Sequence, residues 1–137
     1  MPQFDRVAEN SEEGKNLTFS LIYPKPALLP GRQFVLSAAV ATGVLQVLEK
    51  FGVPRLKVKW PNDIMSANQK IGGILIENVI SEGKVAASVI GIGLNVNQQQ
   101  FKDLPTAGSM RSVCGREFDL EEVLQQLMHA LENMLEE

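Results

Sequence analysis

In the first half of the chain the spacing of apolar residues changes from that of a β-strand to that of an α-helix. In residues 15–23 the apolar Leu17, Phe19 and Leu21 alternate with polar positions, which is the pattern of a half-buried strand. In residues 31–51 the apolar side chains recur at the 3.6-residue spacing of a helix about five turns long, and small residues occupy most of its other faces. Small side chains allow close packing, so we expect this helix to lie directly against a sheet.

The second half of the chain predicts three more strands and a second long helix. Residues 57–60 form a short alternating run that ends before Pro61, which has no N–H to donate to a sheet. Residues 71–80 and 84–93 are two apolar runs joined by a short turn that contains glycine, and they predict an antiparallel hairpin. A helix with leucines along one face is predicted to follow Asp119, which is placed to cap it.

The remaining segments carry no regular period. Residues 1–13 hold several acids and few apolar residues, so we expect a poorly ordered N-terminal arm there. Residues 102–112 are punctuated by proline and glycine, so we expect a loop between the hairpin and the last helix. No repeat or linker divides the chain, and residues 14–137 are predicted to form one α+β domain.

The composition fits a single globular domain and excludes several classes of protein. The chain has 137 residues, 45% of them hydrophobic and 21% charged, which fits neither a disordered nor a fibrous protein. Its net charge of −3 argues against a nucleic-acid-binding surface, which requires a clustered basic face. No apolar run reaches the roughly 18 residues that a membrane span needs. Cys114 has no second cysteine to pair with, which favours a reducing compartment. We therefore expect a soluble, cytoplasmic protein with no membrane or nucleic-acid partner.

The stretch with the clearest chemical content joins a polar turn to a lysine beside two glycines. Asn62 and Asp63 follow the 57–60 strand, and their short side chains suit either an Asx turn or a contact with a ligand. Lys70 is followed, after one residue, by two adjacent glycines, so its ammonium would lie beside exposed backbone. A compact cation there would stabilise charge on a carboxylate or phosphoryl oxygen. Trp60 is expected in the core or as a wall of the cleft.

A second glycine-containing motif, Gly91-Ile-Gly-Leu-Asn95, ends the second arm of the hairpin. It begins like a dinucleotide-binding fingerprint, but valine stands where that fingerprint needs its third glycine. Two interpretations stay open. Either the glycines relieve crowding while the Asn95 amide caps a loop, or they admit a flat ligand to which Asn95 hydrogen-bonds. The chain has no P-loop sequence, and its single histidine and single cysteine give no support to a metal site.

Three blocks of sequence occur in a specific order. They are Lys59-Trp-Pro-Asn-Asp63, Lys70-Ile-Gly-Gly-Ile-Leu-Ile-Glu77 and Gly91-Ile-Gly-Leu-Asn-Val-Asn97. Together they resemble the catalytic domain of biotin protein ligases, also called biotin–acetyl-CoA-carboxylase ligases, and the resemblance extends over residues 14–135. It implies the class II synthetase-like fold of that family, with a mixed, largely antiparallel sheet and helices packed on one side.

The resemblance also implies a two-step reaction and a role for each matching residue. In that family the biotin carboxylate attacks the α-phosphate of ATP in the presence of Mg²⁺, and a lysine of a carboxyl-carrier protein then takes the biotinyl group from the adenylate. Lys70 matches the catalytic lysine that contacts the biotin carboxyl and the adenylate. The nucleotide-side matches are Asn62, Asp63 and Asn95, and the biotin-side matches are Gly73, Gly91 and Gly93. No fixed metal site made by protein ligands alone is expected.

The chain departs from the family pattern ahead of Gly14. Family members carry there a Gly-Arg-Gly-Arg-x-Gly loop and further polar residues that recognise the biotin ureido ring, and this sequence has no counterpart. Biotin binding is then expected to weaken, because each unmatched buried polar group costs about 1–3 kcal/mol. Two hypotheses follow. The chain is a biotin ligase, or it is an inactive truncated remnant that at most binds a nucleotide or dimerises. A homodimer through sheet edges is expected.

Overall fold

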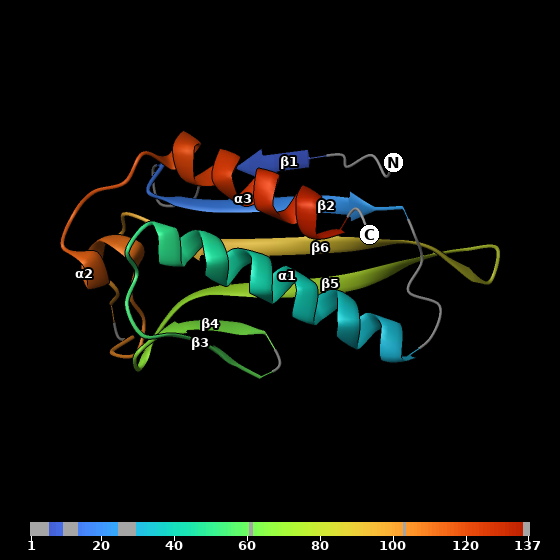
Figure 1. Cartoon of the computed structure of the whole chain (residues 1–137), viewed down its shortest axis with the longest axis horizontal. Helices are drawn as coiled ribbons and strands as arrows, with labels where there is room; N and C mark the ends of the chain where they lie inside the picture. The colour runs from blue at the N-terminus through green and yellow to red at the C-terminus, as the bar shows by residue number, and fades with distance from the viewer. Residues whose placement is uncertain (1–5, 10–13, 25–29, 61, 103, 136–137) are drawn as a thin grey trace.

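The computed structural model describes residues 6–9, 14–24, 30–60, 62–102 and 104–135, and these residues form six strands and three helices. The strands are β1 (Arg6–Glu9), β2 (Asn16–Tyr23), β3 (Leu56–Lys59), β4 (Asp63–Ser66), β5 (Gln69–Ser81) and β6 (Lys84–Asn95). The helices are α1 (Pro30–Lys50), α2 (Met110–Cys114) and α3 (Leu120–Leu135). The strands make one sheet in the order β1-β2-β6-β5-β4-β3 (Figure 1).

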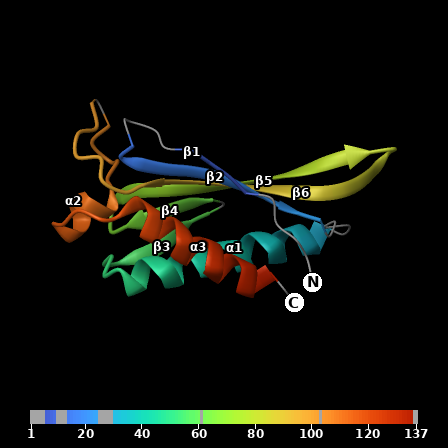
Figure 2. The ribbon, with the colours of Figure 1, turned by 90° about the horizontal axis from the view of Figure 1, so that it is seen from above.

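The sheet is antiparallel, and both long helices lie against the same face of it. All five pairings between neighbouring strands are antiparallel. A parallel contact occurs as an isolated bridge between Lys70 and Ala107. Figure 2 shows α1 and α3 together on one side of the sheet, and in the described part of the chain no helix covers the other side. The predicted α+β class, with a largely antiparallel sheet and helices on one side, is confirmed.

Helices α1 and α3 form where the apolar spacing predicts them and pack closely on each other. Helix α1 buries Val40, Val44 and Leu48 at four-residue intervals, and α3 buries Leu131. Gly43 lets the two helices approach, since a Cβ added there would lie 3.2 Å from Leu131 Cδ2. Among the described helices, none has both the length and the hydropathy needed to cross a bilayer.

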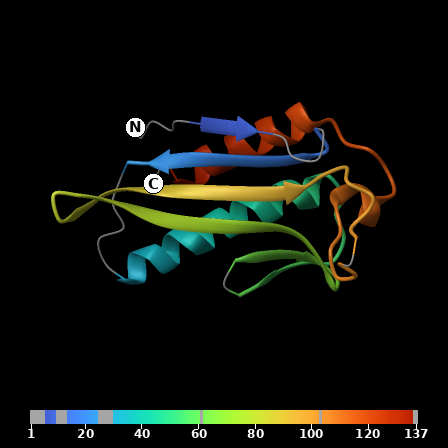
Figure 3. The same ribbon diagram turned by 180° about the vertical axis from the view of Figure 1, so that it is seen from behind.

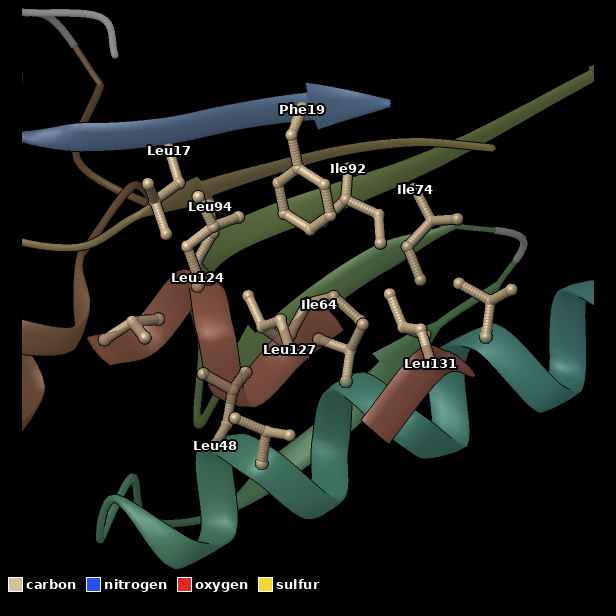
Figure 4. Close-up of a cluster of buried hydrophobic side chains, with 14 of the residues drawn as sticks. Leu17, Phe19, Leu48, Ile64, Ile74, Ile92, Leu94, Leu124, Leu127 and Leu131 are labelled. Atoms are coloured by element: carbon tan, nitrogen blue, oxygen red, sulfur yellow. The ribbon is translucent and has the colours of Figure 1, made fainter. Parts of the chain in front are cut away.

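The core lies between the sheet and the two helices, and it uses alternate residues of each strand. Ile92 and Leu94 of β6 are buried, and Figure 4 shows them beside Phe19 of β2 on the side of the sheet that the helices cover. Successive side chains of a strand point to opposite faces. Gly91 and Gly93, which alternate with these core residues, therefore belong to the helix-free face.

Helix α3 begins at the predicted cap. Asp119 Oδ1 accepts hydrogen bonds from the amide nitrogens of Glu121, at 3.0 Å, and Glu122, at 3.4 Å. These bonds satisfy donors of the first turn that have no partner within the helix. The segment before it needs a correction, because residues 102–112 are predicted as loop but α2 begins at Met110. A reciprocal pair of hydrogen bonds between Ser109 and Ser112 caps this short helix.

Two strands were missed by the sequence pattern. Arg6–Glu9, inside the arm expected to be poorly ordered, forms β1 and pairs with β2, while residues 1–5 and 10–13 lie outside the described residues. Backbone hydrogen bonds to a neighbouring strand order β1 without any apolar period. Strand β4 follows the polar turn directly. Buried Ile64 holds it to the core, and the Ser66 hydroxyl donates to the Pro54 carbonyl oxygen at 2.7 Å.

Candidate functional site

The helix-free face of the sheet carries a hollow of about 440 Å³. Figure 3 looks onto this face, where β2, β4, β5 and β6 contribute residues to the hollow. Six of the residues singled out from the sequence line it: Asn62, Asp63, Lys70, Gly73, Gly91 and Gly93. Segments that are far apart in the chain are therefore brought to one place.

Three glycines keep the floor of the hollow flat. Gly73 and Gly93 are direct partners in the β5–β6 pairing, and a Cβ added to Gly93 would meet no atom within 4 Å. A Cβ on Gly73 or Gly91 would make ordinary contacts, at 3.7 Å from the Asn62 carbonyl oxygen and 3.5 Å from the Leu75 carbonyl oxygen. Packing of the sheet does not require glycine at these positions, so the absent side chains leave space that a ligand can occupy.

Gly72 is a glycine for a different reason. It lies opposite Leu94 in the β5–β6 pairing, on the core side of the sheet. A Cβ added there would lie 2.7 Å from the Gly93 carbonyl oxygen and 3.2 Å from the Leu94 side chain. The two adjacent glycines therefore have different roles. Gly72 permits close packing on the core side, and Gly73 leaves the hollow open.

Lys70 and Asp63 form an ion pair at the hollow. The Lys70 Nζ lies 3.1 Å from Asp63 Oδ1, and the two side chains are 53% and 36% exposed. An ion pair with this much contact with water adds little to stability, so its members can exchange partners with a charged ligand. A Cβ on Gly73 would be 3.9 Å from the Lys70 Nζ. The ammonium therefore stands directly above the glycine floor.

Asn95 lies on the same face but does not line the hollow. Its Nδ2 donates to the Gly108 carbonyl oxygen at 3.1 Å. The Gly108 amide in turn donates to the Lys70 carbonyl oxygen at 3.0 Å, and the Lys70 amide donates to the Thr106 carbonyl oxygen at 2.7 Å. In the structure the Asn95 amide thus holds a loop, while its predicted contact with a ligand stays a prediction.

Trp60 does not line this hollow. It is 67% exposed and packs against Phe34 of α1, with ring centres 5.3 Å apart. In the β3–β4 pairing Lys59 is the residue opposite Asp63 and so belongs to the helix-free face. The next residue, Trp60, turns towards the helices, and its predicted role as a cleft wall stays a prediction.

The sequence reasoning missed three side chains at the hollow. Thr18 and Ser20 of β2 and Leu75 of β5 line it. The sequence does indicate that Thr18 and Ser20 face away from the core, because they are the polar positions that alternate with buried residues of β2. The pairing of β2 with β6, which places Thr18 beside Gly93 and Ser20 beside Gly91, could not be read from that pattern. Two hydroxyls and one apolar side chain thus border the floor.

A second hollow, of about 450 Å³, lies on the helix side between the end of α1 and the start of α3. Arg116 lines it, but its guanidinium donates to the Phe51 carbonyl oxygen at 2.7 Å and stands 4.1 Å from the centre of the Phe118 ring. This cation therefore fastens two segments of the protein to each other. No residue of the three sequence blocks lines this hollow, and we place the candidate site on the helix-free face.

Comparison with known proteins finds biotin protein ligases among the relatives of this chain. The bifunctional ligase/repressor BirA of Bacillus subtilis is 37% identical over 130 residues, which cover 90% of this chain and 39% of that protein. The chloroplastic biotin–protein ligase 1 of Arabidopsis thaliana is 39% identical over 85 residues, which cover 61% of this chain and 23% of that protein. The chain thus spans well under half the length of these curated relatives.

Solved structures of biotin protein ligases share the fold. The ligase of Aquifex aeolicus superposes with a TM-score of 0.79 at 23% identity, over 95% of this chain and 57% of that one. The same ligase in complex with biotin and ATP gives a TM-score of 0.75 at 26% identity, over 88% of this chain and 50% of that one. The family model described as "Biotin/lipoate A/B protein ligase family" matches residues 9–95, which is more than half of the chain. The chain belongs to this family of biotin and lipoate ligases.

Proposed function

We propose that the hollow is the adenylation site of a biotin protein ligase. The observation that carries this proposal is the meeting of a lysine ammonium, an aspartate carboxylate and a flat glycine floor in one open hollow. The family and the biotin ligases among its relatives support the substrate. Such a site needs a cation where a carboxylate meets a phosphate, and Lys70 supplies one.

The proposed reaction has two steps. In the first, an oxygen of the biotin carboxylate attacks the α-phosphorus of ATP, which forms biotinyl adenylate and releases pyrophosphate. In the second, the amine of a lysine on a carboxyl-carrier protein attacks the acyl carbon, which forms an amide and releases AMP. Negative charge develops on oxygens near the same carbon and phosphorus in both steps. A fixed ammonium at Lys70 stabilises that charge more in the transition state than in the ground state.

The floor and its borders suit the acid substrate. Gly73, Gly91 and Gly93 let a flat or extended ligand lie directly on the strands. Leu75 is 56% exposed beside them and offers an apolar surface to an acyl chain. Thr18, on the opposite side of the floor, offers a hydroxyl that can donate or accept a hydrogen bond.

The residues of the hollow also fit a magnesium ion that arrives with ATP. Mg²⁺ at such sites takes one or two protein carboxylates and completes its coordination with phosphates and water. Asp63 supplies one carboxylate at the hollow, and Asn62 adds an amide. No cluster of three or more histidine, cysteine or acidic residues occurs in the part of the chain that the structure describes. Bound Mg²⁺ would offset the charge of the phosphates.

The partners proposed with this function are biotin, ATP and a carboxyl-carrier protein as the acceptor. A homodimer through sheet edges remains part of the proposal. In the order of strands, β1 and β3 form the two edges of the sheet, and an edge strand offers backbone groups that a second copy can pair with. Size-exclusion chromatography with light scattering decides this, since a mass that stays at that of one chain at all concentrations would remove the dimer.

The test is adenylate formation by the chain itself. We would incubate it with biotin and ATP labelled at the α-phosphate and follow biotinyl adenylate and pyrophosphate, with lipoate as the competing acid. The expected result is adenylate formed from biotin and not from lipoate. Lys70→Gln should lower its rate about 10²- to 10³-fold. The matched control Lys57→Gln removes an exposed lysine of β3 that does not line the hollow, and it should leave the rate unchanged.

Each other outcome has a definite meaning. No adenylate from either acid, in a chain that is folded, would favour the inactive remnant over the ligase. Adenylate formed from lipoate instead would keep the family and overturn the substrate. Equal rates for Lys70→Gln and the unsubstituted chain would remove Lys70 from the reaction.

A further inference from the structure

We propose that Lys59 is a second cation of the candidate site and that it binds the β- and γ-phosphates of ATP, both in the bound nucleotide and in the pyrophosphate that leaves. This inference rests on the proposed function of the hollow. Its binding content, that Lys59 helps to hold a polyphosphate, can be tested on the chain without an acid substrate.

The hollow by itself offers no net positive charge to a triphosphate. Of the described residues that line it, Lys70 is the cation and Asp63 is the anion, and the two are paired with 3.1 Å between Nζ and Oδ1. Their charges therefore cancel. Sites that transfer phosphoryl groups set Lys, Arg and Mg²⁺ together against the charge of the phosphates. A further protein cation within reach of the hollow is therefore expected.

The geometry of the proposed adenylation indicates where that cation should lie. An oxygen of the acid forms a bond to the α-phosphorus, the bond from that phosphorus to the oxygen shared with the β-phosphate breaks, and pyrophosphate leaves with the electron pair. The attacking and leaving oxygens lie roughly in line in such a displacement. An acid over Gly73 and Gly93 lies on β5 and β6, so pyrophosphate should leave on the opposite side, across Asp63 of β4 towards β3.

Lys59 of β3 lies on this path. It is opposite Asp63 in the β3–β4 pairing, and Asp63 is opposite Gly73 in the β4–β5 pairing, so the three residues form one row across the helix-free face. Figure 3 shows β4 and β3 on the side of β5 that faces away from β6. Neighbouring strands are about 4.8 Å apart, a distance that the flexible lysine side chain can span. Lys59 is exposed and has no ion-pair partner in the described part of the chain, so its ammonium can bind a phosphate.

Lys57 provides a matched control on the same strand. It is exposed like Lys59 and two residues away, so it points to the same face, but it is opposite Met65 and lies outside the row of Asp63 and Gly73. Lysines on an edge strand also discourage pairing with another sheet. Lys57 and Lys59 would share that role equally, whereas contact with pyrophosphate would distinguish them.

The first experiment measures the binding of magnesium pyrophosphate to the chain by calorimetric titration. Lys59→Gln should raise the dissociation constant about tenfold, the loss expected for one hydrogen bond to a charged group, while Lys57→Gln should leave it within about twofold. Lys59→Arg keeps a cation that binds phosphate and should stay within about threefold of the unsubstituted chain. The melting temperature should be the same in all variants, because both lysines are exposed.

Two results of this titration would overturn the proposal. One is an affinity in Lys59→Gln that falls no more than in Lys57→Gln, which would mean that the edge lysines attract anions without a specific contact. The other is no binding of magnesium pyrophosphate by the unsubstituted chain at millimolar concentration.

The second experiment separates contact with the leaving group from contact with the acid. In the adenylation assay Lys59→Gln should raise the KM for ATP and lower kcat, each about tenfold, because negative charge on pyrophosphate grows as the bond breaks. The KM for biotin should stay within about twofold, since Lys59 does not line the hollow. An unchanged kcat and KM for ATP would overturn the proposal, and so would an equal rise in the KM for biotin, which would indicate a structural effect.

Failure of the proposed function would be recognised separately. If the unsubstituted chain forms no adenylate, the proposed function fails, and the titration with magnesium pyrophosphate still decides whether Lys59 holds a polyphosphate. If adenylate forms and the titration shows no difference between Lys57→Gln and Lys59→Gln, the proposed function stands and the role of Lys59 is overturned.

Discussion

Gly93→Val should make the fold more stable and the hollow less able to bind. The substitution adds a β-branched side chain near the C-terminal end of β6, on the helix-free face. No atom lies within 4 Å of the added Cβ, so the strand accepts the change without moving its neighbours. The new methyl groups occupy space above the floor, between Gly73 of β5 and Thr18 of β2.

The two effects have opposite signs and can be estimated separately. Replacing a glycine inside a strand removes an entropic cost of about 0.5–1 kcal/mol, so the melting temperature should rise by about 2–4 °C. Forcing a ligand against two extra methyl groups costs about 1–3 kcal/mol, as in other overpacked sites. At about 1.4 kcal/mol per tenfold change in affinity, the dissociation constant should rise roughly 5- to 150-fold.

The assay pairs thermal unfolding with calorimetric titration of biotin in the presence of a non-hydrolysable ATP analogue. Gly72→Val is the control, because its Cβ would lie 2.7 Å from a backbone carbonyl oxygen on the core side. That variant should lose about 1–3 kcal/mol of stability. Two results would refute the reasoning. One is a Gly93→Val chain that binds as tightly as the parent, and the other is a Gly93→Val chain destabilised as much as Gly72→Val.

Three further predictions concern other parts of the fold. Leu131→Ala empties a fully buried position between α1 and α3 and should lower the free energy of unfolding by about 2–5 kcal/mol, measured by urea denaturation. Asn97→Ala leaves the Phe118 amide and carbonyl without their side-chain partner and should cost about 1–3 kcal/mol in the same assay. Burial raises the pKa of the Cys114 thiol above its ordinary value, while the charge of Arg116 opposes this. Less thiolate is then present at pH 8, so iodoacetamide should alkylate Cys114 more slowly than free cysteine at that pH, and the rate should rise as the pH increases. Alkylation of Cys114 at the same rate as free cysteine would contradict the raised pKa.

The sequence was most informative where one face of an element is buried. Helix α1 and the β5–β6 hairpin appear where their apolar periods predict them, because burial of Val44 or Ile92 fixes both the period and the direction of the side chain. Strand β1 carries no such period, since its order comes from backbone pairing with β2. Helix α2 depends on a serine pair and on buried Met110, which are too short a signal to separate from loop.

The site could be predicted in its chemistry and not in its geometry. The lysine, the acid and the glycines were visible as residue types, and the structure brings most of them to one hollow. The tasks of Gly72 and Gly73 could not be told apart in the sequence, because the side of the sheet that each faces depends on register. The contacts that Trp60 and Asn95 make within the chain could not be predicted for a related reason. Their contacts, with Phe34 and with Gly108, join segments whose approach no local pattern reveals.

The large sequence separation between the paired strands β2 and β6 has a consequence for the order of folding. The hydrogen bond from the Val96 amide to Asn16 joins positions 80 residues apart, whereas β5 and β6 are joined by a turn of two residues. Closing the long loop costs more chain entropy, so we expect the hairpin to form early and β2 to dock late during folding. Pulse-labelling should then find β6 amides protected before those of β2, and simultaneous protection would contradict this order. The border of the hollow that Thr18 and Ser20 form would be completed only in the last step, so a molecule bound there would slow unfolding by retaining β2.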